Sequence, residues 1–247
     1  MKPSIAVLLL AIAIVMIAPR PCDAQDVREF VHRIYFEGIP YQEVLRFDPA
    51  TAVPVLLQML ADPKEEDYWT NIVVTLGMLG DAKAVDPLID FLTRDELPQL
   101  LSHAKYIAKS SVVMSLGYIV NKSHNEKALE FLLASADPDV WTRRNVKWVS
   151  PYHRTEQERN RQLSTMSIIG LGLTGNPKAA EFLRGLRQSS TIRTQIPGIE
   201  PVIREALSAN ETIASKGLAG YYAGKSNPTE RTPPKGRPSK RPPRTTP

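Results

Sequence analysis

The sequence predicts an all-α protein built from one two-helix pattern that is repeated along the chain. Apolar side chains recur at the i, i+3, i+4 and i+7 positions of amphipathic helices over most of residues 40–187. Gly followed by Asp or Asn separates the two helices of two pairs, and a Leu-Gly pair lies inside the first helix of three pairs. These observations place a helical repeat domain at residues 25–224, between an N-terminal segment at residues 1–24 and a C-terminal tail at residues 225–247.

The N-terminal segment has the pattern of a secretory signal peptide. Lys2 gives it a positive start, and residues 5–18 form an unbroken apolar run of 14 residues. This run is shorter than the roughly 20 apolar residues of a membrane-spanning helix. Small residues at Cys22 and Ala24 predict cleavage before Gln25. The chain is therefore predicted to be exported, periplasmic or secreted, with no transmembrane segment after cleavage.

Two alternatives for this segment stay open, an uncleaved anchor and a lipoprotein acylated on Cys22. Cys22 is the only cysteine of the chain, so the predicted mature protein has none. A mature chain without cysteine suits an oxidising compartment, and it excludes disulfides, thiolate zinc sites and cysteine catalysis.

The clearest helix pair is predicted over residues 69–92. Its first helix ends at Gly80, because glycine readily adopts the left-handed conformation that closes a helix. Asp81 then caps a second helix, whose apolar residues, among them Val85 and Leu88, fall on one face.

Three further copies of this pair are predicted. They lie at residues 48–60, where the second helix is clearest, at residues 112–133 and at residues 168–186. In the last copy, Gly175, Asn176 and Pro177 repeat the junction chemistry, with the proline at a first-turn position where it costs little.

Three glycines fall inside the first helices of these pairs, at Gly77, Gly117 and Gly172. Glycine in a helix interior costs roughly 1 kcal/mol relative to alanine. We therefore expect neighbouring helices to approach each other closely at these positions.

Residues 75–92, with the sequence TLGMLGDAKAVDPLIDFL, resemble the HEAT repeat of the phycobilisome-lyase-like type. Residues 171–180 are a second match, residues 107–134 a weaker one, and the resemblance covers roughly residues 40–187. It implies a short right-handed HEAT-like α-solenoid of antiparallel helix pairs with a concave face. HEAT arrays serve as scaffolds, inhibitors and adaptors and occasionally as enzymes, so the resemblance says little about function.

The ends of the domain are predicted to close the stack. Residues 199–207 and 210–222 form a last helical pair with its turn at residues 208–210. At the other end, residues 26–36 and 41–47 shield the first repeat.

A segment of about 15 extra residues before the last copy is the candidate binding surface. It combines aromatic and cationic side chains, which together grip anionic or flat partners. Its members are Trp141, Arg143, Arg144, Lys147, Trp148, Tyr152 and Arg154. The two tryptophans are spaced i, i+7 and are predicted to share one helix face. The alternative is that they are core residues of an extra helix and that the cations form an ordinary solvated face.

The positive charge of the chain is concentrated at its C-terminal tail. The net charge is +5, of which the tail carries +6 and the first 24 residues +1, leaving −2 for residues 25–224. The helical domain is thus not expected to bind nucleic acid. The tail has seven prolines and seven cations and is predicted to be disordered. It either attaches to anionic envelope polymers or lipid head groups, fits a partner groove, or only solubilises the terminus.

No catalytic, cofactor or metal site is predicted. The four histidines are scattered, without the repeated His-Glu pairs from which a HEAT-repeat hydroxylase family, deoxyhypusine hydroxylase, builds a di-iron site. The sequence therefore favours a non-catalytic exported scaffold that binds another protein. The alternative is a binding module for an anionic envelope polymer or ligand, using the 141–154 segment and the basic tail.

Overall fold

The computed structural model describes residues 24–94 and 98–225. Within them it contains twelve α-helices and two short 3₁₀ helices, η1 and η2. Strand-like pairing in the described residues is limited to one isolated parallel bridge between Leu100 and Val149. The all-α prediction is therefore confirmed. The predicted signal peptide, up to residue 23, and the tail from residue 226 lie outside the described residues.

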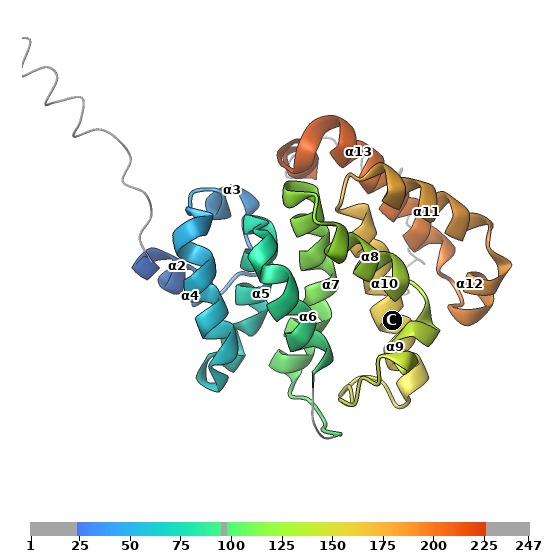
Figure 1. Cartoon of the computed structure of the whole chain (residues 1–247), viewed down its shortest axis with the longest axis horizontal. Coiled ribbons are helices and arrows are strands. Elements are labelled where there is room, and N and C mark those ends of the chain that lie inside the picture. The colour runs from blue at the N-terminus through green and yellow to red at the C-terminus, as the bar shows by residue number, and fades with distance from the viewer. Residues whose placement is uncertain (1–23, 95–97, 226–247) are drawn as a thin grey trace, which may run out of the picture.

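Up to residue 195 the helices follow one another across the molecule roughly in chain order, and the last helix then runs back over them (Figure 1). The first part holds α2 (Ala24–Val31), α3 (Tyr41–Val44), α4 (Pro49–Ala61), η1 (Pro63–Tyr68), α5 (Trp69–Leu79), η2 (Ala82–Ala84) and α6 (Val85–Thr93). The second part holds α7 (His103–Ser123), α8 (Glu126–Ser135), α9 (Pro138–Arg143), α10 (Glu156–Gly172), α11 (Pro177–Gln188), α12 (Ser190–Gln195) and α13 (Glu200–Lys225). None of the described helices is both long enough and apolar enough to span a membrane.

Four helices form the central row of the fold: α5 packs on α7, α7 on α10, and α10 on α13. The helices α4, α6, α8 and α11 flank this row, with α6 on α7, α8 between α7 and α10, and α11 on α13. The predicted apolar stripes form the core, since Leu88, Leu132 and Leu183 are all fully buried. At the N-terminal end α2 packs on α4, and Phe30 meets Phe47 edge-to-face at 5.1 Å between ring centroids.

The predicted junctions are confirmed by backbone geometry. Gly80 and Gly175 both have positive φ, at 76° and 58°, and so end α5 and the turn after α10 in the left-handed region. Asp81 accepts a hydrogen bond from the Lys83 amide at 2.8 Å and caps η2, the 3₁₀ turn that leads into α6. Asn176 caps α11 in the same way, with its side chain 2.8 Å from the Lys178 amide nitrogen.

The predicted close approaches at the helix-interior glycines are also confirmed. A Cβ built on Gly77 would lie 2.6 Å from Cα of Ser115, which joins α5 to α7. A Cβ on Gly117 would collide with the backbone oxygen of Gly170, where α7 meets α10. The small residues therefore let the central helices pack almost backbone to backbone.

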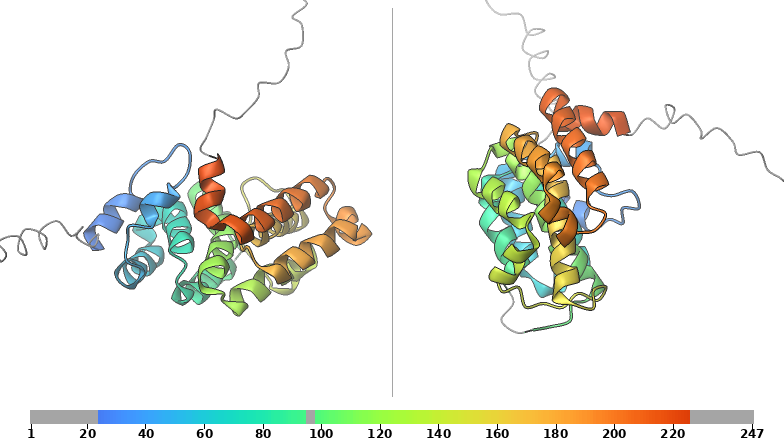
Figure 2. Two further views of the ribbon diagram at one scale, coloured as in Figure 1. Left: turned by 90° about the horizontal axis from the view of Figure 1, so that it is seen from above. Right: turned by 90° about the vertical axis from the view of Figure 1, so that its right-hand side faces the viewer.

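The predicted closing pair is wrong in one respect, because α13 continues through residues 208–210 without a turn. The Asn210 side chain is buried and donates to the carbonyl oxygen of Leu171 and to Oγ1 of Thr174, both at 2.9 Å. This tertiary contact keeps the segment helical. The interruption comes at Gly217 instead, with φ 70° and ψ 170°, after which the last turns leave α13 at an angle (Figure 2).

These last turns of α13 reach back to α3, near the start of the described chain. The Tyr222 ring stacks on the Tyr41 ring with centroids 5.4 Å apart, and its hydroxyl is hydrogen-bonded to that of Tyr118. Burial raises the pKa of both Tyr118 and Tyr222 above the usual value. A tyrosine cluster thus joins the end of α13 to α3 and α7.

Candidate functional site

The structure places the two tryptophans of the 141–154 segment in the core, both 0% exposed. They do not share a helix face, because α9 ends at Arg143 and Asn145 adopts φ 53°. Trp148 lies in the following non-helical stretch. The indole N–H of Trp141 donates to the Ser135 carbonyl at 3.0 Å, so a polar partner is met within the fold. The predicted shared helix face is therefore wrong, and the core alternative holds for both side chains.

The cations of this segment have different surroundings. Arg144 is half-buried, with its guanidinium 3.8 Å from the Phe131 ring centroid and 2.5 Å from Oγ of Ser135. Burial lowers the pKa of Arg144 to about 10. Arg143 is exposed and pairs with Asp137 at 3.3 Å, while Lys147 is exposed. Of these three, only Arg143 and Lys147 could meet a partner without leaving the packed structure.

Arg159 supports this segment and was not recognised from the sequence. It is 3% exposed, donates from Nη1 to the Trp148 carbonyl at 2.7 Å, and binds Oδ1 of Asn160 through Nε and Nη2. Burial lowers its pKa. The first turns of α10 have the composition of an exposed, charged helix start. The sequence therefore does not indicate that Arg159 is buried.

Tyr152 and Arg154 remain accessible and lie together at one hollow of about 670 Å³. Arg161, Gln162 and Thr165 from α10 complete its polar wall. The structure therefore brings together two of the seven predicted binding residues and adds others that the sequence did not indicate.

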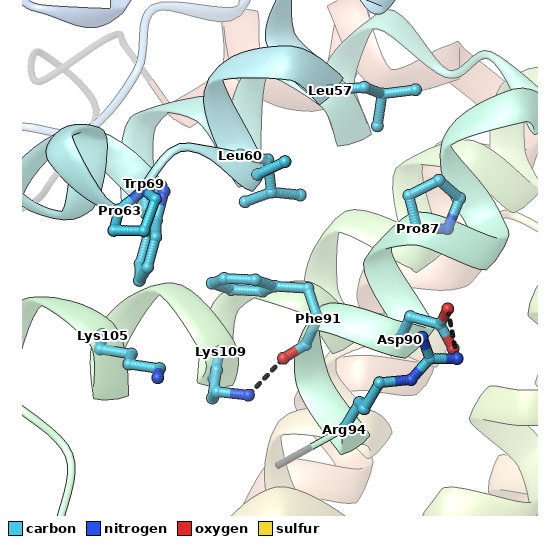
Figure 3. A pocket seen from close by; sticks show the side chains of 11 residues that line it. Leu57, Leu60, Pro63, Trp69, Pro87, Asp90, Phe91, Arg94, Lys105 and Lys109 are labelled. Carbon is cyan, nitrogen blue, oxygen red and sulfur yellow. Dashed lines mark hydrogen bonds and ion pairs between the residues drawn. The ribbon is translucent and has the colours of Figure 1, made fainter. Parts of the chain in front are cut away.

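A second concave site is a groove of about 430 Å³ between α4 and α6 (Figure 3). Its apolar wall is made by Leu57 and Leu60 of α4 and by Phe91 of α6, and the Trp69 ring meets Phe91 edge-to-face at 5.2 Å. Leu57, Leu60 and Trp69 fall on the amphipathic stripes of the sequence, so they were expected in the core, whereas Phe91 lies beside the stripe of its helix. Leu60 and Trp69 are buried, and the partial exposure of Leu57 and Phe91 depends on the packing of α4 and α6, which no local pattern encodes.

Cationic side chains lie along the α7 edge of this groove. Lys105 is half-exposed, whereas Lys109 is 1% exposed, and Figure 3 shows its ammonium bound to the Phe91 carbonyl oxygen. Lys109 also lies 5.1 Å from the Phe91 ring centroid. At the far end of α6, Arg94 pairs with Asp90 at 3.0 Å. The ammonium of Lys109 therefore stabilises the C-terminal carbonyls of α6. The described lining holds three cations, Arg94, Lys105 and Lys109, and one carboxylate.

The described lining of the groove is mainly apolar and carries few polar groups. This described lining holds one carboxylate, Asp90, which is engaged by Arg94, and no Ser, Cys or His side chain. A nucleophile with an adjacent base is therefore missing from the described lining. Across the described ranges, no three His, Cys, Asp or Glu side chains gather as they would around a metal ion.

Comparison with known proteins gives no relative from which a role could be transferred. The chain matches no family model, no curated protein and no solved structure.

Proposed function

We propose that this chain is a non-catalytic scaffold that binds another protein in the groove between α4 and α6. The observation that carries the proposal is an apolar groove of about 430 Å³ whose described lining holds three cationic side chains and one carboxylate. Ligand sites are concave and mostly apolar, with a few polar groups that fix orientation. A short amphipathic segment of a partner, with apolar side chains and an acidic residue, matches this chemistry.

The scaffold is organised as a short right-handed HEAT-like solenoid of antiparallel helix pairs. The recurring Gly-Asp and Gly-Asn junctions and the close helix approaches at Gly77 and Gly117 support this arrangement. In such a stack each pair contacts only its neighbours, and grooves between the pairs are available to partners.

The scaffold acts outside the cytoplasm, in the periplasm or beyond the cell. The support is the apolar run at residues 5–18, followed by small residues at Cys22 and Ala24. Intact-mass measurement of the native protein tests this step. A mature chain that begins at Gln25 agrees with it, and a retained N-terminus or a lipid on Cys22 contradicts it.

The alternative function, binding of an anionic partner by the 141–154 segment together with the basic tail, has less support. Trp141, Trp148 and Arg144 are packed within the fold, and the tail lies outside the described residues.

A charge placed in the groove tests the scaffold proposal. Leu57→Glu puts a carboxylate on the apolar wall and repels an acidic partner, while Leu45→Glu makes the same change at an exposed leucine away from the groove. The parent and both variants are used to capture proteins from the exported fraction, and the captured partner is then purified for direct titration. The expected result is one partner that binds the parent and Leu45→Glu alike but binds Leu57→Glu at least about tenfold more weakly. Equal binding by all three contradicts the proposal.

A further inference from the structure

The hollow at Tyr152 and Arg154 lies between the loop before α10, the first turns of α10 and the turn after α12. It shares no lining residue with the groove between α4 and α6, so an inference about it does not rest on the scaffold proposal. Ile196 forms its apolar side.

One face of α10 supplies the polar wall. Glu158, Arg161, Gln162 and Thr165 are spaced i, i+3, i+4 and i+7, so their side chains lie above one another on the helix surface. Thr165 donates to the carbonyl oxygen of Arg161 at 2.8 Å, which leaves its hydroxyl oxygen able to accept a hydrogen bond. The wall therefore presents an amide and a hydroxyl beside a guanidinium.

The hollow has a net positive charge. Within the described residues, neither the Arg154 nor the Arg161 guanidinium has a hydrogen-bond or ion-pair partner. The one carboxylate in the lining, Glu158, is bound by the backbone amides of Arg154 and Thr155 at 2.8 and 3.2 Å as part of the capping box of α10. Burial lowers the pKa of the adjacent His153, which keeps its imidazole neutral at pH 7.

The Tyr152 ring provides a flat face at the mouth of the hollow. It is 56% exposed, yet its ring is held against Tyr106, 5.2 Å between centroids, and against His103 at 5.6 Å. A ring fixed on one side and open on the other can stack on a flat partner with little loss of conformational entropy.

We infer that this hollow binds an acidic saccharide, with a sugar ring against Tyr152 and its carboxylate held by Arg154 and Arg161. Guanidinium groups bind carboxylates through paired, charge-assisted hydrogen bonds. A sugar ring also has an apolar face for an aromatic side chain and hydroxyls for the Gln162 amide and the Thr165 hydroxyl. An acidic peptide would use the two arginines but would not need this combination of aromatic face, amide and hydroxyl.

Isothermal titration of the full chain with trigalacturonate tests the inference, with maltotriose as the neutral sugar and tetraglutamate as the acidic peptide. We expect binding of trigalacturonate, no measurable heat with maltotriose, and at least about tenfold weaker binding of tetraglutamate. The ligand could be a free acidic sugar or a segment of an acidic polymer, and titration with galacturonic acid distinguishes the two. Equal affinities for galacturonic acid and trigalacturonate indicate a free sugar, and a higher affinity for trigalacturonate indicates a polymer segment.

Three variants locate the binding. Arg161→Gln and Tyr152→Ala should each weaken trigalacturonate binding at least about tenfold, while Arg204→Gln, an exposed arginine on α13, should leave it unchanged. If Arg161→Gln lowers the melting temperature, Arg154→Gln replaces it as the test variant. Arg154 is exposed, so this substitution should keep the fold intact. Binding of maltotriose or tetraglutamate as tight as that of trigalacturonate overturns the inference. So does no binding of trigalacturonate, or full binding by Arg154→Gln and Tyr152→Ala.

Discussion

Trp148 donates its indole N–H to the carbonyl oxygen of Leu92 at 2.9 Å, across 56 residues of sequence. Leu92 lies in the last turn of α6, where backbone carbonyls have no partner within their own helix. Arg159 in turn binds the Trp148 carbonyl from α10 at 2.7 Å. A residue that the sequence offered as a contact for a ligand thus connects the end of one helix to the start of another.

Replacing this tryptophan tests the connection. Trp148→Phe should lower the free energy of unfolding by about 2–4 kcal/mol, because it leaves a buried carbonyl without its main donor and opens a cavity. Trp69→Phe is the matched control, since its indole N–H is 3.4 Å from the Met59 carbonyl and contributes less. Urea unfolding followed by circular dichroism gives both values. A loss at Trp69 equal to that at Trp148 would show that the hydrogen bond adds nothing to packing.

The close approach of α7 and α10 predicts opposite effects at two helical glycines. Gly117→Ala should destabilise the protein by about 3 kcal/mol, because the new Cβ collides with the Gly170 backbone oxygen and forces the helices apart. Gly185→Ala in α11 meets nothing within 4 Å and should stabilise by about 0.5–1 kcal/mol. Thermal and urea unfolding measure both variants. A neutral Gly117→Ala would mean that α7 and α10 pack less tightly than described.

Neighbouring arginines of the 141–154 segment should differ in their effect on stability. Arg144→Ala removes stacking on Phe131 and a hydrogen bond to Ser135, for an expected loss of about 2 kcal/mol. Arg143→Ala removes an exposed ion pair and should change stability by less than about 0.5 kcal/mol. Urea midpoints of the two variants decide the matter, and equal midpoints would refute the distinction.

The tyrosine cluster predicts a loss of stability in alkali. Burial raises the pKa of Tyr118 and Tyr222 in the folded chain above the value of about 10 that a tyrosine has in the unfolded chain. Below about pH 10 both tyrosines are protonated in both states, and the stability of the folded chain is at its full value. Above that pH the unfolded chain releases protons that the folded chain retains. Stability should therefore fall by about 1.4 kcal/mol per pH unit for each such tyrosine. Melting temperatures from pH 9 to 11.5 should fall less steeply in Tyr118→Phe than in the exposed control Tyr152→Phe, and parallel curves would contradict the assignment.

Much of the fold follows from local signals in the sequence. Gly80 with Asp81 and Gly175 with Asn176 act through their own backbone conformation and caps, so the junctions were predicted at the right residues. The turn at residues 208–210 was predicted wrongly because Asn210 obtains its partners from Leu171 and Thr174, which are distant in sequence. Tertiary hydrogen bonds of this kind override a local preference for a turn.

The candidate sites could be predicted only in part. Tyr152 and Arg154 were recognised by composition, but Arg161 and Ile196 join them only through the packing of α10 beside the turn after α12. Trp148 was placed on the same helix as Trp141 because the positive φ of Asn145, which separates the two, is not visible in a residue pattern. Leu57 was predicted as a core residue, because its exposure in the groove depends on the spacing of two helices that no local pattern encodes.

The contact between Tyr41 and Tyr222 ties the end of the described chain to a helix near its start. An open helical array can fray from either end, since each unit depends only on its neighbours. Here α3 and α7 both lose a partner when the end of α13 detaches, so fraying of the C-terminal helix uncovers earlier parts of the chain. Formation of this contact requires closure of nearly the whole described chain, a large entropic cost that only the assembled helices can offset. We therefore expect a single cooperative unfolding transition, with the last turns of α13 among the last elements to dock during folding.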